Sequence, residues 1–431
     1  MQTIELLTSA WHGDHPLSLD FPDNWRLQVL GDQSLPAMPA EELRQRVCTP
    51  VSGQPLRQIA VGHQRAAILI DDLSRPTPVG DILPAVMAEL ELAGIPPGQV
   101  VLVVAGGTHT PLDDDAVQKK LGGGQYPVQA VVSHDSRGQM SYLGKTARGT
   151  PLYLNPQVLQ CDLRIAVGCI YPHPAAGFSG WAKALAPGVA GAETIRAMHD
   201  HLQGAKERVA GVENEFRQEA ERIASQVGLH FIVNAALNQQ RQVHALFAGD
   251  FLHAFRAGVD YVRKAYAVPS RLAVDITVAD MYPFDADLQF AFDRGMWPLY
   301  AAPPFSRRVL LAACPRGLGT HVLYPLQRSL QARLSRRLKH FRLRDLTSLA
   351  YRLRAAYRLV AHQKVEVMLV STGLDEAGVK SVFPSGRLFP DWDSASAELE
   401  RSFPQSAQSG LSVAIYRCAP LMVPGKETCV P

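Results

Sequence analysis

Short, wholly apolar runs alternate in the first half of the chain with segments whose apolar residues recur at helical spacing. Apolar runs bounded by turn residues predict buried strands, and here they are residues 66–69, 100–105, 128–132 and 163–167. Residues 81–92 and 114–121 lie between these runs and have the spacing of amphipathic helices. This alternation predicts βα units around a parallel sheet.

A second α/β pattern begins after Val268 and Pro269, which form the predicted domain boundary. Helices are predicted before this boundary at residues 190–201 and 214–227. Strands are predicted after it at residues 272–278, 308–313, 365–369 and 411–416. A chain of 431 residues is long enough for two or three domains. The expected fold class is therefore α/β, with two domains and mainly parallel sheets.

The composition is that of an ordinary globular protein, with 47% hydrophobic and 19% charged residues. The net charge of +3 gives no sign of a nucleic-acid partner, and no apolar run is as long as a membrane span. The first residues lack the basic start and apolar block of a signal peptide. Six cysteines occur without a C-x-x-C pair, which argues against a zinc knuckle or a disulfide framework. We therefore expect a cytoplasmic protein with no membrane or nucleic-acid partner.

Residues 328–358 stand out by their charge, because they hold ten Lys or Arg residues and one acidic residue, Asp345. Leucine and tyrosine recur there at helical spacing, which favours amphipathic helices with solvated basic faces. A basic binding surface is the alternative.

Polar residues follow each of the four strands predicted in the first half. Residues 71–75 follow the first strand, residues 107–109 the second, His134 and Asp135 the third, and residues 171–173 the fourth. Ligands of open α/β sheets bind beyond the carboxyl ends of the strands, so we expect the four loops to converge on one site. His134 and Asp135 are the least specific of these residues, and they fit a role in fixing the loops at least as well as direct catalysis.

Residues 168–201 combine three histidines, a lysine and a run of small residues that let the backbone approach a ligand closely. Lys183 follows this run, where a poorly hydrated amine is available for covalent chemistry; binding of an anion is the alternative. His173, His199 and His201 suit proton transfer or metal ligation near neutral pH, or structural hydrogen bonds.

Ser179 lies in the same segment, but its surroundings do not predict a nucleophile. The stretch from Gly177 to Trp181 lacks the second glycine of a G-x-S-x-G elbow. Lys183 is one residue too distant for an S-x-x-K motif. A contact with a cofactor phosphate, or a role in shaping the loop, fits Ser179 better.

These motifs, taken in order, resemble the nickel-pincer lactate racemase family. Residues 172–201 resemble its Pro-His pair, its A-G-[FY]-S-G-G-x-K and P-G-x-x-G-x-E-T-I runs and its closing histidine, with Trp181 in place of a glycine. Residues 71–76 resemble its D-D-x-[ST]-R-P motif, and residues 107–109, 133–135 and 149–155 fit further segments. The similarity is dense from about residue 65 to 201, thinner to about 300 and faint beyond, except near the end of the chain.

The resemblance implies two domains with the active site in the cleft between them. In this family the end of the chain returns to the first domain. The implied cofactor-binding domain is residues 1–268 together with about 416–431, and the second domain is residues 269–415.

The resemblance also implies a cofactor, pyridinium-3-thioamide-5-thiocarboxylic acid mononucleotide, which grips a nickel ion as a pincer. By position Lys183 carries this group covalently, and His199 completes the ligation of nickel, a metal that suits imidazole in a tetragonal arrangement. His201 is the competing candidate for the metal. The implied cofactor-binding residues are Lys183, Asp72, Arg75 and Ser179.

His109 and His173 correspond to the paired acid and base histidines of the family. A racemase needs a proton-accepting group on each face of a planar intermediate, and two neutral imidazoles meet that need near neutral pH. Arg75 offers a planar fork for a carboxylate or phosphate, and Asp72 orients it or contacts the cofactor. A local ion pair is the alternative for these two residues.

One motif departs from the family pattern P-x-D-x-x-x-Y-Q-x-x-K, in which glutamine and lysine bind substrate. Gln289, Phe290 and Asp293 stand here in place of its tyrosine, glutamine and lysine. A carboxylate cannot bind a small carboxylate as an ammonium group does, although Arg294 is a substitute if the register shifts. Phe290, Phe292 and Trp297 predict a bulkier, more apolar pocket. The candidate substrate-binding residues are Arg75, Gln289, Phe290, Asp293, Arg294 and Trp297.

The expected function is that of an isomerase, a nickel-pincer-dependent racemase or epimerase of a 2-hydroxy acid other than lactate. The resemblance implies hydride transfer from C2 to the cofactor and its return to the other face of a 2-keto acid. The expected partners are the small-molecule substrate and the enzymes that make the cofactor. Two alternatives stay open: a metal-dependent hydrolase that uses the histidines and not Lys183, and a non-catalytic protein that carries a cofactor or binds through a basic surface.

Overall fold

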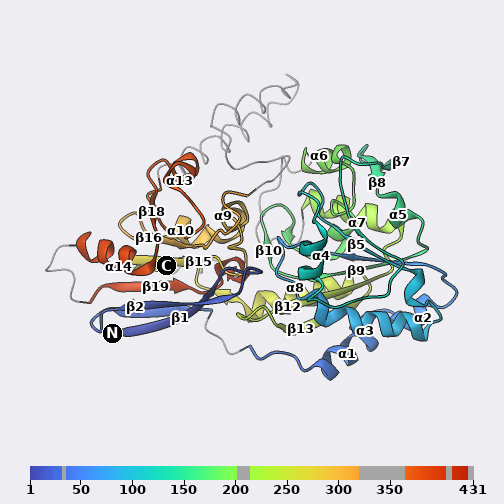
Figure 1. The fold of residues 1–431 in the computed structure, drawn as a ribbon, viewed down its shortest axis with the longest axis horizontal. Helices are drawn as coiled ribbons and strands as arrows, with labels where there is room; N and C mark the ends of the chain where they lie inside the picture. The colour runs from blue at the N-terminus through green and yellow to red at the C-terminus, as the bar shows by residue number, and fades with distance from the viewer. Residues whose placement is uncertain (32–34, 201–213, 320–364, 404–409, 426–431) are drawn as a thin grey trace, which may run out of the picture. The chain divides into compact units, whose positions relative to one another are not determined.

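The computed structural model describes residues 1–31, 35–200, 214–319, 365–403 and 410–425. The chain divides into two compact units, which are described separately below (Figure 1). The unit that we call the central unit is Ser34–Ala265. The other, the terminal unit, combines Met1–Gln33 with Tyr266–Pro431.

The central unit is built on a six-stranded sheet with the strand order β13-β12-β9-β4-β5-β6. Neighbouring strands are parallel except for β12 and β13, which are antiparallel. All residues of β4 and β5 are apolar and buried, as expected for parallel strands covered on both faces. The bounds are β4 (Ala66–Ile70), β5 (Val100–Val104), β6 (Ala130–Ser133), β9 (Leu163–Cys169), β12 (Phe231–Leu237) and β13 (Val243–Gly249).

Helices and two small hairpins complete the central unit. Figure 1 draws α1, α2 and α3 together, and these three helices contact one another. Helix α8 packs on β12 and β13. The helices are α1 (Ala40–Cys48), α2 (Leu56–Ala60), α3 (Val79–Leu92), α4 (Asp114–Lys120), α5 (Pro156–Leu159), α6 (Ala192–Asp200), α7 (Glu215–Val227) and α8 (His253–Ala265), with 3-10 turns η1 (Pro97–Gln99) and η2 (Trp181–Ala184). The hairpins are β7 (Ser141–Lys145) with β8 (Pro151–Leu154), and β10 (Pro172–His173) with β11 (Gly177–Phe178).

The terminal unit has its own six-stranded sheet, with the order β18-β17-β16-β15-β19-β3 and all neighbours parallel. Its strands are β3 (Arg26–Leu30), β15 (Ile276–Asp280), β16 (Arg307–Leu311), β17 (Met368–Val370), β18 (Arg387–Phe389) and β19 (Ser412–Tyr416). Its helices are α9 (Leu288–Gly295), α10 (Trp297–Ala301), α13 (Glu376–Val382) and α14 (Trp392–Arg401), with the 3-10 turn η4 (Ala419–Leu421).

The first residues of the chain belong to the terminal unit because their apolar side chains are buried there. Strand β3 pairs with β19, and the hairpin of β1 (Gln2–Thr8) and β2 (His15–Phe21) shares a core with the sheet. Phe21 packs against Trp392 with ring centroids 5.0 Å apart. The indole N–H of Trp392 donates to the carbonyl of Asp20 at 2.9 Å. The short strands β14 (Ala267–Val268) and β20 (Val423–Pro424) also pair within this unit.

The expectation of two α/β units with mainly parallel sheets is confirmed, and the predicted strands of the central unit match β4, β5, β6 and β9 to within two residues at each end. The division of the chain differs from the prediction at both termini. Residues 1–33 join the second unit through β3, and the end of the chain stays with that unit through β19 and β20. The change of unit at residues 265 and 266 lies close to the predicted boundary.

Three further predictions need comment. The strand expected at residues 272–278 begins only at Ile276. The helix expected at residues 190–201 is Ala192–Asp200, and His201 lies outside the described residues. The basic segment 328–358 also lies outside them. No helix in the described part of the chain is long and apolar enough to cross a membrane.

Candidate functional site

Three adjacent strands of the central sheet, β9, β4 and β5, end at the same edge and carry the loops that the sequence singled out. Ile70 at the end of β4 pairs with Val104 of β5 on one side and with Val167 of β9 on the other. The loops that begin at Asp71, Ala105 and Ile170 therefore start side by side. This edge is the candidate functional site.

Asp72 and His109 form a short polar pair at this edge. Nδ1 of His109 lies 2.6 Å from Oδ2 of Asp72, and the hydroxyl of Ser74 donates to the other carboxylate oxygen. Asp72 is buried, whereas 15% of the His109 side chain is exposed. The structure thus confirms that the loops after β4 and β5 meet. Nε2 of His109 therefore lies on the side of the imidazole that faces away from Asp72.

Charges and hydrogen bonds set the protonation state of this pair. Burial alone would raise the pKa of Asp72, but His109, Arg75 and the hydroxyl of Ser74 hold it well below its usual range. Asp72 is therefore ionised and only accepts hydrogen bonds, so Nδ1 of His109 carries a proton. Nε2 of a neutral His109 is then the basic nitrogen.

Arg75 lies in the same network. Its Nη1 donates to the hydroxyl of Ser74 at 2.7 Å. Burial works against its charge, but the neighbouring groups of Tyr171, Asp72 and Asp71 raise its pKa. Arg75 is thus a permanently charged planar donor at the edge of the sheet.

Lys120, at the end of α4, fixes the loop that carries these residues. Its side chain is completely buried, and its Nζ lies 2.5 Å from Oδ1 of Asp71. The same ammonium donates to the carbonyls of Arg75 at 3.1 Å and Thr77 at 3.0 Å. Three acceptors therefore surround the three donors of one ammonium. Sequence analysis missed Lys120, because a lysine at the end of a polar helix gives no signal of burial.

His173 lies in the hairpin of β10 and β11, after β9. It pairs with Gly177, whose φ of 74° closes the three-residue turn between them. Nδ1 of His173 accepts the backbone N–H groups of Ala175 at 3.1 Å and Ala176 at 3.2 Å. Because these donors occupy the lone pair of Nδ1, the proton of the neutral ring is on Nε2.

Ser179 follows this hairpin, and its hydroxyl donates to the carbonyl of Cys169 at 2.8 Å. Its backbone N–H donates to the carbonyl of Tyr171. Both bonds shape the turn at the end of β9, which is the structural role considered for Ser179. Its contact with a cofactor remains a prediction.

Lys183 lies in η2 and is half-buried. The turn starts at Gly180, where φ is 85° and a Cβ atom would lie 2.5 Å from Oδ1 of Asn234, so a larger residue does not fit. The carbonyl of Lys183 accepts the N–H of Gly188, and the carbonyl of Gly188 accepts the N–H of Gly107. The segment that carries Lys183 is thus bonded to the loop that carries His109.

His134, in the loop after β6, is buried and bonds the segment that follows Lys183. Its Nε2 bonds the carbonyl of Ala190 at 3.0 Å, and its Nδ1 bonds the amide of Asn155 at 3.2 Å. Burial lowers the pKa of His134, so it is neutral near pH 7. Asp135 is exposed and accepts the N–H of Arg137. His134 therefore fixes the loops, and neither residue is placed by these bonds to do direct catalysis.

His199 lies in the last turn of α6. Its Nδ1 is 2.7 Å from the carbonyl of Ile195, to which it donates, so Nε2 is the unprotonated nitrogen of the neutral ring. The ring meets that of Phe216 edge to face, with centroids 5.1 Å apart. A histidine fixed in this tautomer suits metal ligation through Nε2.

The described residues do not supply a metal site from protein side chains alone. Among them, no group of three or more His, Cys, Asp or Glu side chains that could hold a metal ion occurs. The single imidazole and the half-buried amine of Lys183 fit a cofactor of the kind that the sequence motifs imply.

Apart from Arg75, which lies in the central unit, the predicted substrate residues lie in the terminal unit, on α9 and α10. Gln289, Phe290 and Arg294 are buried, and Asp293 is exposed. The guanidinium of Arg294 lies over the ring of Phe290 at 4.8 Å. These facts place the residues within the unit, and their contact with substrate remains a prediction.

Two aromatic residues that were expected to enlarge the substrate pocket pack inside the terminal unit. The indole N–H of Trp297 donates to the carbonyl of Ala419, and its ring meets that of Tyr416 edge to face. Phe292 packs against Phe383, with ring centroids 5.7 Å apart.

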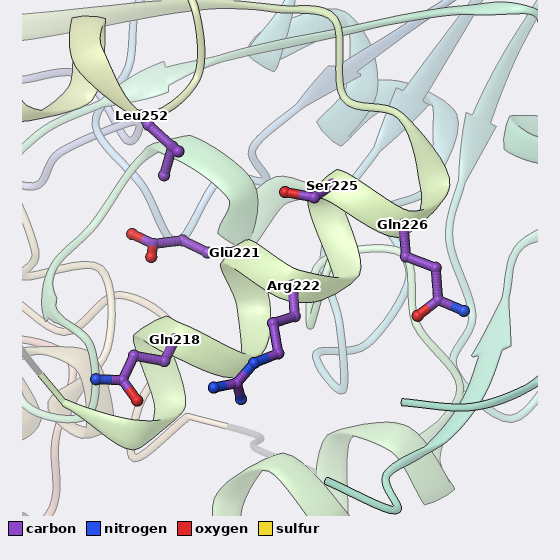
Figure 2. Close-up of a pocket in the computed structure, with 6 residues that line it drawn as sticks. All are labelled: Gln218, Glu221, Arg222, Ser225, Gln226 and Leu252. Atoms are coloured by element: carbon purple, nitrogen blue, oxygen red, sulfur yellow. The ribbon is translucent and has the colours of Figure 1, made fainter. Parts of the chain in front are cut away.

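A hollow of about 580 Å³ on the outer face of α7 is a separate feature (Figure 2). It is wide open, and none of the predicted site residues lines it. Its lining residues are Gln218, Glu221, Arg222, Ser225, Gln226 and Leu252.

Comparison with known proteins agrees with this picture. Residues 12–211 match the lactate racemase N-terminal domain. The lactate racemase of Lactiplantibacillus plantarum is 27% identical over 283 residues, which are 64% of this chain and 66% of that protein. The lactate racemase of Thermoanaerobacterium thermosaccharolyticum is 26% identical over 325 residues, 73% of this chain and 76% of that protein. The matched segments thus span about two thirds to three quarters of these relatives.

Solved structures show the same fold. The lactate racemase apoprotein of Thermoanaerobacterium thermosaccharolyticum has a TM-score of 0.74 at 24% identity, covering 99% of this chain and 100% of that one. A protein of Thermotoga maritima solved by a structural genomics consortium has a TM-score of 0.63 at 14% identity, covering 89% of this chain and 97% of that one. The fold and the site define a two-unit α/β protein with a histidine-rich edge on its central sheet. Residues 12–211 are thus similar to the N-terminal domain of lactate racemases, and the chain shares the fold of a lactate racemase apoprotein.

Proposed function

We propose that this protein is an isomerase that racemises or epimerises a 2-hydroxy acid. The observation that carries the proposal is the pair of Asp72 and His109 at the carboxyl edge of the sheet. Ionised Asp72 keeps the proton on Nδ1 of His109, so that Nε2 is the basic nitrogen that accepts the proton of a substrate hydroxyl. Similarity to two curated relatives, both of them lactate racemases, supports a racemase.

The proposed cofactor is the nickel-pincer nucleotide, held covalently by Lys183 and ligated through nickel by His199. When bound, it supplies a hydride acceptor for C2 of the substrate. The chain's own residues bind and orient the substrate and the cofactor. Arg75 offers a charged fork to the substrate carboxylate or to the cofactor, and His109 takes the hydroxyl proton while Asp72 stabilises the resulting imidazolium. His173 is the second imidazole that the proposal places at the substrate.

The proposed substrate is a 2-hydroxy acid other than lactate, with a bulky or aromatic side chain. Phe290 and Asp293 replace the glutamine and lysine of the family pattern, so a small carboxylate loses two polar partners. Like charge at Asp293 also disfavours a second substrate carboxylate unless Arg294 offsets it. The chemistry further requires enzymes that make the cofactor, and we propose the cytoplasm as the place where loading occurs.

A metal-dependent hydrolase built on the histidines has less support. His109, His173 and His199 bond three different groups, namely a carboxylate, backbone N–H groups and a backbone carbonyl. Within the described residues these side chains do not form a group that could hold a metal ion. Such a hydrolase also gives no role to Lys183.

The mass of the intact protein, expressed together with cofactor-making enzymes, tests the proposal. We expect covalent extra mass that peptide digestion places on Lys183 and that Lys183→Ala abolishes. Lys119→Ala, which removes an exposed lysine, is the control and should leave the adduct unchanged. Unmodified protein with bound zinc would support the hydrolase instead, and an adduct on another lysine would contradict the role of Lys183.

A further inference from the structure

Arg217 is a buried cation that the proposed chemistry does not use. It lies in the first turn of α7, and only 3% of the residue is exposed. Its backbone N–H donates to the side chain of Asn214, the N-cap of the helix, at 2.8 Å. Its guanidinium lies over the ring of Phe255, 4.4 Å from the centroid. Burial of an arginine is costly unless its donors are satisfied, so its contacts indicate what it is retained for.

One of these contacts leads to His173. Nη2 of Arg217 donates to the carbonyl of Ala176 at 2.6 Å. The N–H of the same Ala176 donates to Nδ1 of His173 at 3.2 Å, beside the N–H of Ala175 at 3.1 Å. Arg217 thus holds Ala176, a residue of the three-residue turn whose own N–H bonds the imidazole of His173. A charge-assisted bond of this length is among the stronger constraints that a side chain can place on a backbone.

The turn decides which nitrogen of His173 carries the proton. Two backbone N–H groups directed at Nδ1 require an unprotonated Nδ1, since a proton there would meet two donor hydrogens. The ring then presents Nε2–H. His109 is the opposite case, because ionised Asp72 requires a proton on its Nδ1 and leaves Nε2 basic.

We propose that Arg217 is a positioning residue that holds the turn of residues 174–176, and that this turn keeps His173 as an Nε2–H hydrogen-bond donor. The two site histidines are therefore held in opposite tautomers when neutral: the proton is on Nδ1 in His109 and on Nε2 in His173. The use of the two imidazoles in catalysis rests on the proposed function, whereas the tautomer of His173 does not.

The tautomer is measured by long-range ¹H–¹⁵N spectra of the full chain with ¹⁵N-labelled histidine at pH 7.5. The chain has 14 histidines, so the signals of His173 are assigned by their loss in His173→Gln. For the wild type we expect an unprotonated Nδ1 and a protonated Nε2 at His173. A protonated Nδ1 at His173 would overturn the proposal, whatever the enzyme's activity.

The role of Arg217 is tested by substitution. In Arg217→Met we expect the His173 signals to move to positions averaged between the two tautomers, and in Arg217→Lys, which keeps a donor, to stay near the wild-type positions. Gln226→Met is the control, because Gln226 is an exposed residue of the same helix (Figure 2). If Arg217→Met does not fold, Arg217→Gln replaces it, since a shorter amide keeps polarity without the reach of a guanidinium.

Wild-type His173 signals in a folded Arg217→Met or Arg217→Gln would contradict the role of Arg217. A racemase assay on the same samples separates this inference from the proposed function. Loss of racemisation in every sample with the tautomer pattern intact would contradict only the proposed function.

Discussion

Nδ1 of His109 lies 2.6 Å from Oδ2 of Asp72, although the two residues come from loops that follow different strands of the central sheet. The loops meet because β4 and β5 are parallel neighbours that end in register. Asp72 is buried and ionised, so it holds the imidazole in one tautomer and stabilises its protonated form. This is the arrangement expected of a general base fixed by a carboxylate.

Asp72→Asn should lower turnover by at least ~10²-fold, because an amide no longer stabilises the protonated imidazole and its N–H₂ group favours the wrong tautomer. The nickel content of the loaded protein should stay unchanged. Asp135→Asn removes an exposed carboxylate that follows the neighbouring strand β6, and it should have little effect on turnover. Steady-state rates and metal analysis of the two variants provide the check. Equal turnover in Asp72→Asn and the wild type would contradict the role of Asp72.

His199→Ala should cut the nickel content of cofactor-loaded protein, because the one imidazole with a proposed metal role is removed. His109→Ala and His173→Ala should keep their nickel and lose turnover instead. Metal analysis after loading distinguishes the two classes of variant. Equal nickel loss in all three would show that the roles are assigned wrongly.

Lys120→Met should lower the free energy of unfolding by up to ~3 kcal/mol, because the carboxylate of Asp71, whose side chain is only 20% exposed, loses its cation. The exposed neighbour serves as control, and Lys119→Met should change the free energy of unfolding by less than ~0.5 kcal/mol. Adding Asp71→Asn to Lys120→Met should restore part of the loss, because the unpaired charge is then gone. Chemical denaturation gives these values. Equal stability of the two lysine variants would mean that the ion pair of Lys120 and Asp71 does not support the loop.

Burial raises the pKa of Asp280 in the terminal unit to about 7. In the unfolded chain the pKa of an aspartate is about 3.9. A carboxyl with a raised folded pKa contributes stability that is complete below about pH 4 and is lost as the pH rises through about 7. The free energy of unfolding should therefore fall between pH 6 and pH 8 more steeply in the wild type than in Asp280→Asn.

Asp275→Asn is the control for this pH dependence. The hydroxyl and backbone N–H of Ser412 donate to Asp275 and, against the effect of burial, lower the pKa of its carboxyl, so it stays ionised throughout this range. It should keep the wild-type slope. Parallel slopes for the wild type and Asp280→Asn would show that Asp280 does not titrate with unfolding.

The central sheet and the meeting of its loops could be predicted from the sequence, because buried parallel strands are continuous apolar runs and parallel strands end at one edge. The place of the first 33 residues in the terminal unit could not be predicted. Strand β3 pairs with β19 near the other end of the chain, and no local pattern encodes such a distant partner. The N-terminal hairpin shows the same limit, since Phe21 finds Trp392 only in the folded unit.

At the site, the identities of Asp72, His109 and His173 could be predicted, but their states could not. The tautomer of His173 depends on backbone N–H groups of a three-residue turn, and that turn depends on Arg217 from a distant helix. Lys120 was missed for a related reason. Burial of a lysine follows from three acceptors that only the folded loop brings together.

The fate of the C2 hydrogen tests the proposed racemisation most directly. Single enantiomers of lactate and of larger aliphatic and aromatic 2-hydroxy acids are incubated with cofactor-loaded protein in deuterated buffer. The products are separated on a chiral phase, and their deuterium content is measured by mass spectrometry. We predict interconversion that is faster for a larger acid than for lactate, with little deuterium at C2, because the hydrogen is returned internally. Faster conversion of lactate than of every larger acid would contradict the proposed substrate class. Rapid deuterium uptake at C2, or no interconversion of any acid, would contradict the account itself.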